Sequence, residues 1–329
     1  MHATFERKAM KKLFLILVPA LCLLSCSPSD QTEIALIPKS TDIMYWKALH
    51  AGGEKAAQEL GIKLIWQGPQ KESDREQQIN IVQNFISRGV DAMVLAPLDE
   101  IALMRPVAAA KGRNIPVIIV DSGLQGDDYK GYIATDNFVT GELAAEKLAG
   151  MLNGKGEVIL VRFNEGSNST GLREEGFLNW MHQHAPGITI LSSNQYAGAT
   201  MELALQTGQN LLNKYPNVDG IFCPNEATTF GLMRALKTVG KAGSVKLVGF
   251  DYTDPVEEAI RSGDIAGVVV QDPFRMGYEG VKSAFAVLQG EKVDRLVKTD
   301  VVFVTAENID DPDIVAVTKP DIATWLGEK

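Results

Sequence analysis

Residues 34–66 read IALIPKSTDIMYWKALHAGGEKAAQELGIKLIW, and this stretch decides the fold. Two short apolar runs, IALIP (34–38) and IKLIW (62–66), stand on either side of an amphipathic segment. Continuous apolar runs are typical of parallel strands that are covered on both faces, and the segment between them has the pattern of a helix. The stretch therefore predicts a β-α-β unit with its two strands parallel in one sheet.

The same alternation continues along the chain. Further strand candidates are AMVLA (92–96), IPVIIV (115–120), GYIAT (131–135), EVILV (157–161), ITIL (188–191), VDGIF (218–222), VKLVGF (245–250), AGVVV (266–270) and VVFV (301–304). Helices are expected between them, one of which begins at a capping box of Ser73 and Glu76 and ends at Gly89. These strands are too many for one sheet at this length, so we predict an α/β fold with two doubly wound lobes.

The start of the chain predicts export. Four basic residues precede the apolar run LFLILVPALCLL (13–24), which has the layout of a secretory signal and is too short to cross a bilayer as a helix. The sequence LLSC (23–26) resembles a bacterial lipobox, and an ordinary cleaved signal is the alternative. We therefore expect a lipoprotein signal peptide over residues 1–25, a start of translation at Met1 or Met10, lipidation of Cys26 and a tether over residues 26–32.

Such a protein would lie in the periplasm or on the cell surface, held to a membrane through Cys26. The net charge of −9 becomes more negative when residues 1–25 are removed, which argues against nucleic acid as a partner. Only Cys26 and Cys223 remain after processing, so no disulfide framework is expected. His182 and His184 do not share a face of their predicted helix, and we predict no metal site and no cofactor.

Polar side chains follow the predicted strands at their carboxyl ends, where open parallel sheets form their ligand crevice. These residues are Lys39, Asp121, Asn164, Glu165, Asn225, Glu226, Asp251 and Gln271. Any single Asp or Asn there can be a helix N-cap, but capping does not require Lys39 or Gln271. Tyr45 and Trp46, at the start of the first helix, are either core residues or a stacking surface. Mixed charged, amide and aromatic groups suit a polyhydroxylated ligand, because each hydroxyl both donates and accepts hydrogen bonds.

An ordered set of motifs spans residues 32–310. The motifs are IALIPKSTDIMYWKALHAGGEKAAQELG, DAMVLAPLD, IPVIIVDS, IATDN, REEGF, FCPNE, LVGFD and VVQDPFRMGYEGV. In this order the chain resembles the periplasmic sugar-binding proteins of ABC importers, of the ribose-binding type. The resemblance implies ligand contacts at Tyr45, Trp46, Asp121, Arg173, Asn225, Asp251 and Gln271. The strand ends alone do not point to Arg173, whose alternative role is a surface salt bridge.

The resemblance also implies a type I periplasmic binding protein whose lobes are joined by a three-strand hinge, with crossovers near residues 135–137, 271–273 and 298–301. The expected parts are an N-terminal lobe of residues 33–135 and 272–298, a C-terminal lobe of residues 136–271 and 299–315, and a tail of residues 316–329. Two prolines, Pro312 and Pro320, predict loose packing past Asp310. Closure of the lobes around a sugar or polyol would be detected by an ABC transporter permease, with the protein as a monomer.

The chain also departs from that family. Asp42–Ile43 partly replace a usual polar residue, Ala96 offers no amide, and Ser122 stands where ribose binders carry a basic residue. Lys39, Pro224 and the run WQGP (66–69) instead resemble the quorum-signal binders of the same superfamily.

Two other functions are alternatives to solute binding for transport. A ligand-sensing partner of a membrane receptor would have the same lobes and the same closure. A sugar-acting enzyme is the other alternative, but we identify no catalytic residue: the chain has no GxSxG motif, and GMLNGKG (150–156) lacks the preceding strand and the Ser/Thr after Lys155 of a phosphate-binding loop.

Overall fold

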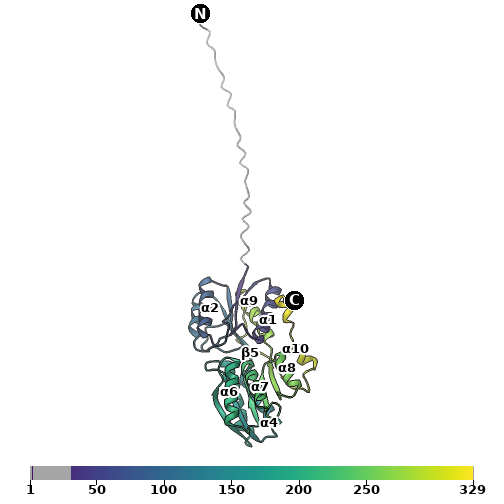
Figure 1. The fold of residues 1–329 in the computed structure, drawn as a ribbon. Helices are drawn as coiled ribbons and strands as arrows, with labels where there is room; N and C mark the ends of the chain where they lie inside the picture. The colour runs from purple at the N-terminus through teal and green to yellow at the C-terminus, as the bar shows by residue number, and fades with distance from the viewer. Residues whose placement is uncertain (1, 3–30, 329) are drawn as a thin grey trace. The chain divides into compact units, whose positions relative to one another are not determined.

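The computed structural model describes His2 and residues 31–328 (Figure 1). The predicted signal peptide apart from His2, the predicted lipidation site Cys26 and residues 26–30 of the tether lie outside the described residues. Thr32–Lys329 form one unit, which contains two β-sheets.

The first sheet has the strand order β11-β5-β4-β3-β1-β2, and all of its neighbouring strands are parallel. We call this sheet and its helices the N-terminal lobe. Its strands are β1 (Glu33–Ile37), β2 (Lys63–Trp66), β3 (Ala92–Leu95), β4 (Val117–Val120), β5 (Gly131–Thr135) and β11 (Leu296–Thr299). Strand β11 was not predicted, because the sequence LVKT holds no run of apolar residues.

The second sheet has the order β12-β10-β9-β8-β6-β7, and with its helices it forms the C-terminal lobe. Its strands are β6 (Gly156–Arg162), β7 (Ile188–Tyr196), β8 (Gly220–Phe222), β9 (Lys246–Phe250), β10 (Gly267–Gln271) and β12 (Val301–Val304). Apart from β12, which pairs antiparallel with β10 at one edge, the strands are parallel. Strands β1 to β5 and β6 to β10 follow the same order in their sheets, so β4 and β9 occupy equivalent places.

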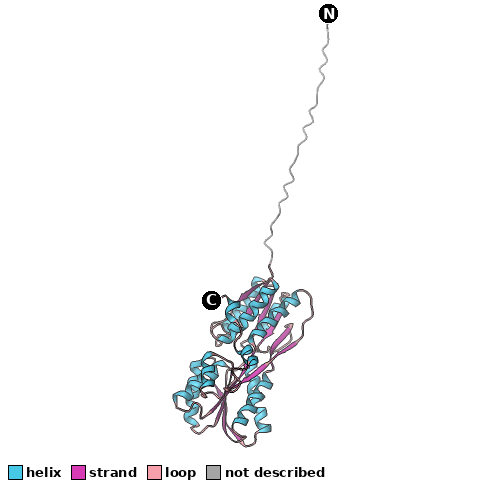
Figure 2. Ribbon diagram, turned by 90° about the vertical axis from the view of Figure 1, so that its right-hand side faces the viewer, coloured by secondary structure: helices cyan, strands magenta, loops and turns pink. Residues whose placement is uncertain are grey.

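Helices cover both faces of each sheet (Figure 2). The N-terminal lobe carries α1 (Met44–Leu60), α2 (Arg75–Arg88), α3 (Met104–Gly112) and α9 (Pro273–Leu288). The C-terminal lobe carries α4 (Asn137–Met151), α5 (Asn168–His184), α6 (Met201–Lys214), α7 (Glu226–Thr238) and α8 (Asp254–Arg261). Alternate residues of each central strand enter different cores: Ile34 and Leu36 face α1 and α9, whereas Ala35 and Ile37 face α2 and α3. Two further apolar clusters cover the second sheet in the same way.

The chain passes between the lobes at three places. Strand β5 ends at Thr135 in the first sheet and α4 packs on the second; β10 ends at Gln271 in the second sheet and α9 packs on the first. The third passage joins β11 to β12 between Thr299 and Val301. The exact lobe boundaries given above stay a prediction.

The ends of α2 test the predicted capping box. Asp74, rather than Ser73, is the N-cap, and its side chain accepts a hydrogen bond from the Gln77 N–H at 2.9 Å. The predicted capping box is therefore wrong. The predicted end at Gly89 is confirmed, because this glycine is left-handed with φ 76°.

The tail past Asp310 packs against both lobes. It forms α10 (Pro312–Thr318), which contacts β10 and β12, and α11 (Ile322–Leu326), which contacts α1 (Figure 1). Lys319 pairs with Glu257 of α8 at 2.8 Å. The expectation of loose packing is therefore wrong for these helices, and the tail joins the two lobes a fourth time.

Candidate ligand-binding site

A polar cavity lies between the lobes, at the carboxyl ends of strands from both sheets. It is lined by all nine predicted ligand-binding residues, namely Lys39, Tyr45, Trp46, Asp121, Arg173, Asn225, Glu226, Asp251 and Gln271. The remaining lining residues are Ile43, Glu72, Phe163, Ser169 and Thr170. The free volume is about 30 Å³, because side chains of the two lobes meet there. The structure thus brings the predicted residues together, while their binding of a ligand stays a prediction.

Two aspartates occupy equivalent positions in the two lobes. Asp121 follows β4 and Asp251 follows β9, and both have left-handed backbones, with φ 62° and 67°. The Asp121 N–H donates to Ile133 O at 3.0 Å, and the Asp251 N–H donates to Val269 O at 2.8 Å. A left-handed conformation is uncommon for residues other than glycine, and such residues cluster at functional sites. The repeated geometry places one carboxyl group from each lobe in the cavity.

The Asp121 carboxyl group is the centre of the N-terminal half of the site. Lys39 Nζ lies 3.0 Å from Asp121 Oδ2, and the Tyr45 hydroxyl donates to Asp121 Oδ1 at 2.8 Å. The side chains of Lys39 and Asp121 are each 5% exposed. Lys39 also donates to Ser169 Oγ at 3.1 Å, and Ser169 belongs to α5 of the other lobe. Lys39 therefore connects the two lobes through the cavity.

Arg173 is the centre of the C-terminal half of the site. Its guanidinium group donates to Asn137 Oδ1 at 2.8 Å, to Pro224 O at 2.9 Å and to Gln271 Oε1 at 2.7 Å. It lies over the Phe250 ring, 4.2 Å from the ring centroid. Arg173 is only 2% exposed, so the alternative of a surface salt bridge is wrong.

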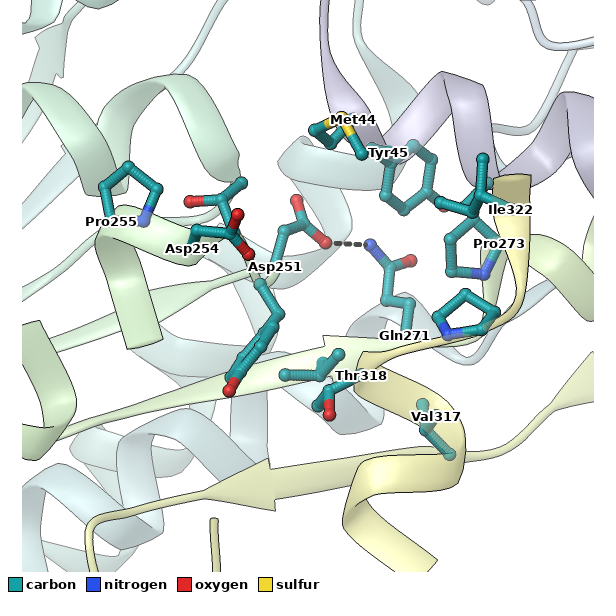
Figure 3. A pocket seen from close by; sticks show the side chains of 15 residues that line it. Met44, Tyr45, Asp251, Asp254, Pro255, Gln271, Pro273, Val317, Thr318 and Ile322 are labelled. Atoms are coloured by element: carbon teal, nitrogen blue, oxygen red, sulfur yellow. Dashed lines mark hydrogen bonds between the residues drawn. The ribbon is translucent and has the colours of Figure 1, made fainter. Parts of the chain in front are cut away.

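Gln271 fixes the orientation of Asp251. Its amide nitrogen donates to Asp251 Oδ1 at 2.8 Å, as Figure 3 shows, while its oxygen accepts from Arg173. Because the Gln271 oxygen is held by a cation, its nitrogen must face the carboxylate. Asp251 Oδ2 accepts from the Glu226 N–H at 3.1 Å. Arg173, Gln271 and Asp251 thus form one hydrogen-bonded chain.

Three predicted residues also have structural roles. Asn225 caps α7 by accepting from the Thr228 N–H at 3.2 Å, so the capping interpretation and a place in the cavity hold together. Trp46 is 2% exposed and belongs to the core on α1, with its ring edge-on to that of Tyr45. Tyr45 packs against the same core through its ring and enters the cavity through its hydroxyl.

Glu72 is the main residue that sequence reasoning missed. Its carboxylate accepts from Trp46 Nε1 at 2.7 Å, yet it lies in the loop before α2 and not at a strand end. Asn164 and Glu165, which do follow a strand, lie outside the cavity. They line an adjoining cavity of about 560 Å³, which Glu72 also lines. We call this adjoining cavity the mouth of the cleft. Glu72 therefore stands between the inner cavity and the mouth.

A second pocket lies on the hinge side of Tyr45, Asp251 and Gln271, which line both spaces (Figure 3). Its volume is about 200 Å³. Its wall is mostly apolar and comes from α1, the start of α8, Pro273 and the tail residues Val317 and Ile322. The tail is therefore part of the structure that surrounds the hinge.

Burial changes the proton affinity of the acidic groups. Desolvation, with the charges of Asp251 and Glu72 next, raises the pKa of Glu226 to about 8. Desolvation raises the pKa of Glu72 to about 7, although Lys39 and the Trp46 hydrogen bond oppose the shift. The pKa of Asp251 is also raised by desolvation, against the opposing charge of Arg173. The site thus holds carboxyl groups that titrate near neutral pH.

These shifts predict how stability depends on pH. Glu226 keeps its proton in the folded protein up to about pH 8, whereas the unfolded chain loses it near 4.5. Between these values the folded state binds more protons, so stability falls as pH rises. Glu72 acts in the same direction, as does Glu174, whose pKa burial raises to about 7. We expect the Tm of the unliganded protein to fall from pH 5.5 to pH 8.5 in calorimetric scans.

Glu226→Gln should make that fall less steep, because the substituted amide does not titrate. Glu202→Gln is the matched control, since Glu202 also lies in the first turn of a helix but is exposed. Equal pH profiles for the two variants would contradict the assignment to Glu226.

The fold and the cavity define a two-lobed protein of the binding-protein type, and comparisons with known proteins agree. Residues 34–292 match the family described as periplasmic binding protein domain. The ribose import binding protein RbsB of Escherichia coli K12 is 32% identical over 301 residues, which cover 91% of this chain and 99% of that protein. RbsB of Haemophilus influenzae is 32% identical, with 84% of this chain and 92% of that protein covered.

A solved structure gives the same result. The carbohydrate transporter solute binding protein of Agrobacterium radiobacter, in complex with D-arabinose, superposes with a TM-score of 0.85 at 34% identity, covering 88% of this chain and 100% of that one. The chain therefore belongs to the periplasmic binding protein family. The predicted α/β fold with two lobes of the type I class is confirmed.

The described part of the chain shows neither a membrane-spanning helix nor a cluster of metal-binding side chains. Within residues 31–328, no helix combines the length and apolar character needed to cross a membrane. In the same range, no three His, Cys, Asp or Glu residues are grouped as they would be around a metal ion. Cys223 is buried with a free thiol.

Proposed function

We propose that the protein captures a monosaccharide or a related polyhydroxylated small molecule for an ABC importer, by closure of its two lobes. The observation that carries this proposal is the chain of hydrogen-bonded polar groups in the cavity, with one left-handed aspartate from each lobe. Such groups match hydroxyls, which donate to carboxylates and accept from Lys39 and Arg173. The hydroxyl of Tyr45 adds a further hydrogen-bonding group to the cavity.

Contacts between the lobes support closure as the binding motion. Besides Lys39 and Ser169, the Ser169 N–H donates to Ser122 Oγ at 3.1 Å and the Glu100 N–H donates to Gly166 O at 3.0 Å. With these contacts in place, the cavity between the lobes has little free space, about 30 Å³. Entry of a sugar therefore requires the lobes to separate, and the three passages between them are the natural hinge.

The remaining parts of the proposal concern location and partners. RbsB is a ribose import binding protein and the arabinose-bound protein is a carbohydrate transporter solute binding protein. The same kind of role for this chain implies an ABC transporter permease as its partner. We propose that the mature protein acts as a monomer in the periplasm or at the cell surface, anchored by lipid on Cys26, and that it has no catalytic activity. Globomycin inhibition of processing and a Cys26→Ser variant test the anchor.

Calorimetric titration with ribose, arabinose, allose, fucose and xylitol tests the binding function. At least one ligand should release heat and raise Tm, and Asp251→Asn should weaken its binding at least 100-fold. The lost hydrogen bonds to a charged group are each worth about 1.5–3 kcal/mol. Asparagine tolerates the left-handed backbone at this position, so the fold should persist. Asp313→Asn, an exposed position on α10, is the control and should bind as the parent does.

The absence of heat and of any thermal shift across this panel would argue against the proposal. So would unchanged affinity in Asp251→Asn.

A further inference from the structure

We infer that the ligand carries a positively charged amino group, as an amino sugar or amino polyol does, and that Glu226 and Glu72 recognise this group. The inference rests on the proposed function and narrows it, because it adds a charged group to the polyhydroxylated ligand. It follows from the charges of the cavity, from one unpartnered carboxyl oxygen and from the mouth of the cleft.

The cavity holds more carboxyl groups than cations. Glu72, Asp121, Glu226 and Asp251 line it, against Lys39 and Arg173. Both cations are already engaged. Lys39 forms a buried ion pair with Asp121, and Arg173 acts on Asp251 directly through its charge and indirectly through Gln271. Lys39 also acts on Glu72 through its charge, so Glu226 is the one of these four acidic groups on which no cation is a leading influence.

In the described part of the chain, Glu226 has a buried carboxyl oxygen that lacks a hydrogen-bond donor. It is 4% exposed, and its Oε2 atom has no hydrogen-bond partner within residues 31–328. The charges that act most strongly on it are the carboxylates of Asp251, Glu72 and Asp42. A buried carboxyl oxygen without a donor is unfavourable, and like charges around it add to the cost. An ammonium group would supply both the donor and the opposite charge, whereas a hydroxyl would supply only the donor.

The mouth of the cleft has the same character. Its wall contains the carboxyl groups of Glu72, Asp74, Glu76, Asp99 and Glu165, with Arg75 as the single cation among its lining residues. Arg75 is paired with Asp99 at 2.7 Å. A cleft lined by one sign of charge attracts ligands of the opposite sign and raises their local concentration. Glu72 lines both spaces and so links the acidic residues of the mouth to the inner cavity that Glu226 lines.

Matched ligand pairs that differ only in an amine or a hydroxyl test the inference. The pairs are D-glucosamine and D-glucose, D-galactosamine and D-galactose, 1-amino-1-deoxy-D-ribitol and ribitol, and 1-amino-1-deoxy-D-sorbitol and sorbitol. N-acetyl-D-glucosamine keeps the nitrogen and removes its charge. In at least one pair we expect the amine to bind at least 10-fold more tightly than the alcohol in calorimetric titrations at pH 7.

Variants then assign the preference to residues. Glu226→Gln should reduce the amine-over-alcohol ratio at least 10-fold, and Glu72→Gln should reduce the ratio less. Glu202→Gln, in the first turn of α6, should leave the ratio unchanged. Titrations in phosphate and in Tris, which differ in ionisation heat, should reveal proton release for the amine only, since the pKa of Glu226 is raised to about 8.

The outcomes separate this inference from the proposed function. If alcohols bind and no amine binds more tightly than its partner, the amine inference is overturned and the sugar-binding function stands. If the amine preference survives in both glutamine variants, its assignment to Glu226 and Glu72 is overturned. If no member of any pair binds and the titrations with ribose, arabinose, allose, fucose and xylitol also fail, the proposed function falls and this inference falls with it.

Discussion

Replacing Arg173 with alanine is expected to abolish ligand binding and to destabilise the unliganded protein by about 3–5 kcal/mol, the usual cost of removing one partner of a buried charged pair. The guanidinium group satisfies Asn137, Pro224 and Gln271 at once, and it offsets the buried charge of Asp251. Its removal takes this donor away from Asn137 Oδ1, Pro224 O and Gln271 Oε1. Calorimetric titration measures the loss of binding, and urea unfolding measures the loss of stability.

Two further variants serve as a control and as a conservative substitution for Arg173→Ala. Arg105→Ala removes an exposed arginine from α3 and should change neither stability nor affinity measurably. Arg173→Lys keeps the charge but supplies fewer, differently placed donors, so it should fold better than the alanine variant and still bind at least 10-fold more weakly than the parent. Parent-like affinity in Arg173→Ala would remove this residue from the site.

Gly141→Ala is expected to destabilise the protein by about 1–3 kcal/mol, or more, as overpacking does in a tight core. Helices α4 and α5 cross closely at this position, and a Cβ atom on Gly141 would collide with the backbone carbonyl of Arg173. The two helices must then move apart, which displaces the guanidinium group from its partners. Ligand affinity should therefore fall together with stability, although residue 141 is not part of the cavity.

Gly150→Ala is the matched control, because it lies in the same helix with open space around its Cβ position. Alanine has a higher helix propensity than glycine, so this variant should be neutral or more stable by up to about 1 kcal/mol. Urea unfolding and titration of both variants check the comparison. Similar stability for the two would show that the α4–α5 crossing is more adaptable than its geometry indicates.

The sequence predicted the strands well where a buried sheet requires apolar residues. Runs such as IPVIIV and VKLVGF can satisfy both faces of a covered strand, and both form strands in the structure. Strand β11 was not predicted, because an edge strand needs fewer apolar residues than a central one and Lys298 interrupts its sequence. The antiparallel direction of β12 follows from its direct connection to β11, since the chain enters the second sheet without a crossover helix.

The candidate site was predictable to the extent that it lies at strand ends. Asp121, Asp251 and Gln271 follow from that rule, because parallel strands bring their carboxyl ends to one edge. Arg173 follows only from the resemblance, since its position within a helix gives no signal of burial. Glu72 gave no signal at all, because a loop carboxylate in a polar stretch looks like a solvated residue.

The prolines of the tail were interpreted wrongly for a physical reason. Proline breaks the interior of a helix, but at the first helical position its missing N–H is not needed and its fixed φ is already helical. Pro312 occupies that position in α10, and Pro320 stands between α10 and α11. The same residues therefore mark the start of one helix and the turn between two, and not a loose segment.

The tail has a consequence for the energetics of uptake. Since α10 rests on one lobe and α11 on the other, a rotation that separates the lobes must alter the short link between these helices or detach one of them. The contacts of α10 and α11 therefore contribute to the equilibrium between the open and closed forms of the unliganded protein. A ligand's apparent affinity depends on that equilibrium, so it is set partly by residues that never touch the ligand.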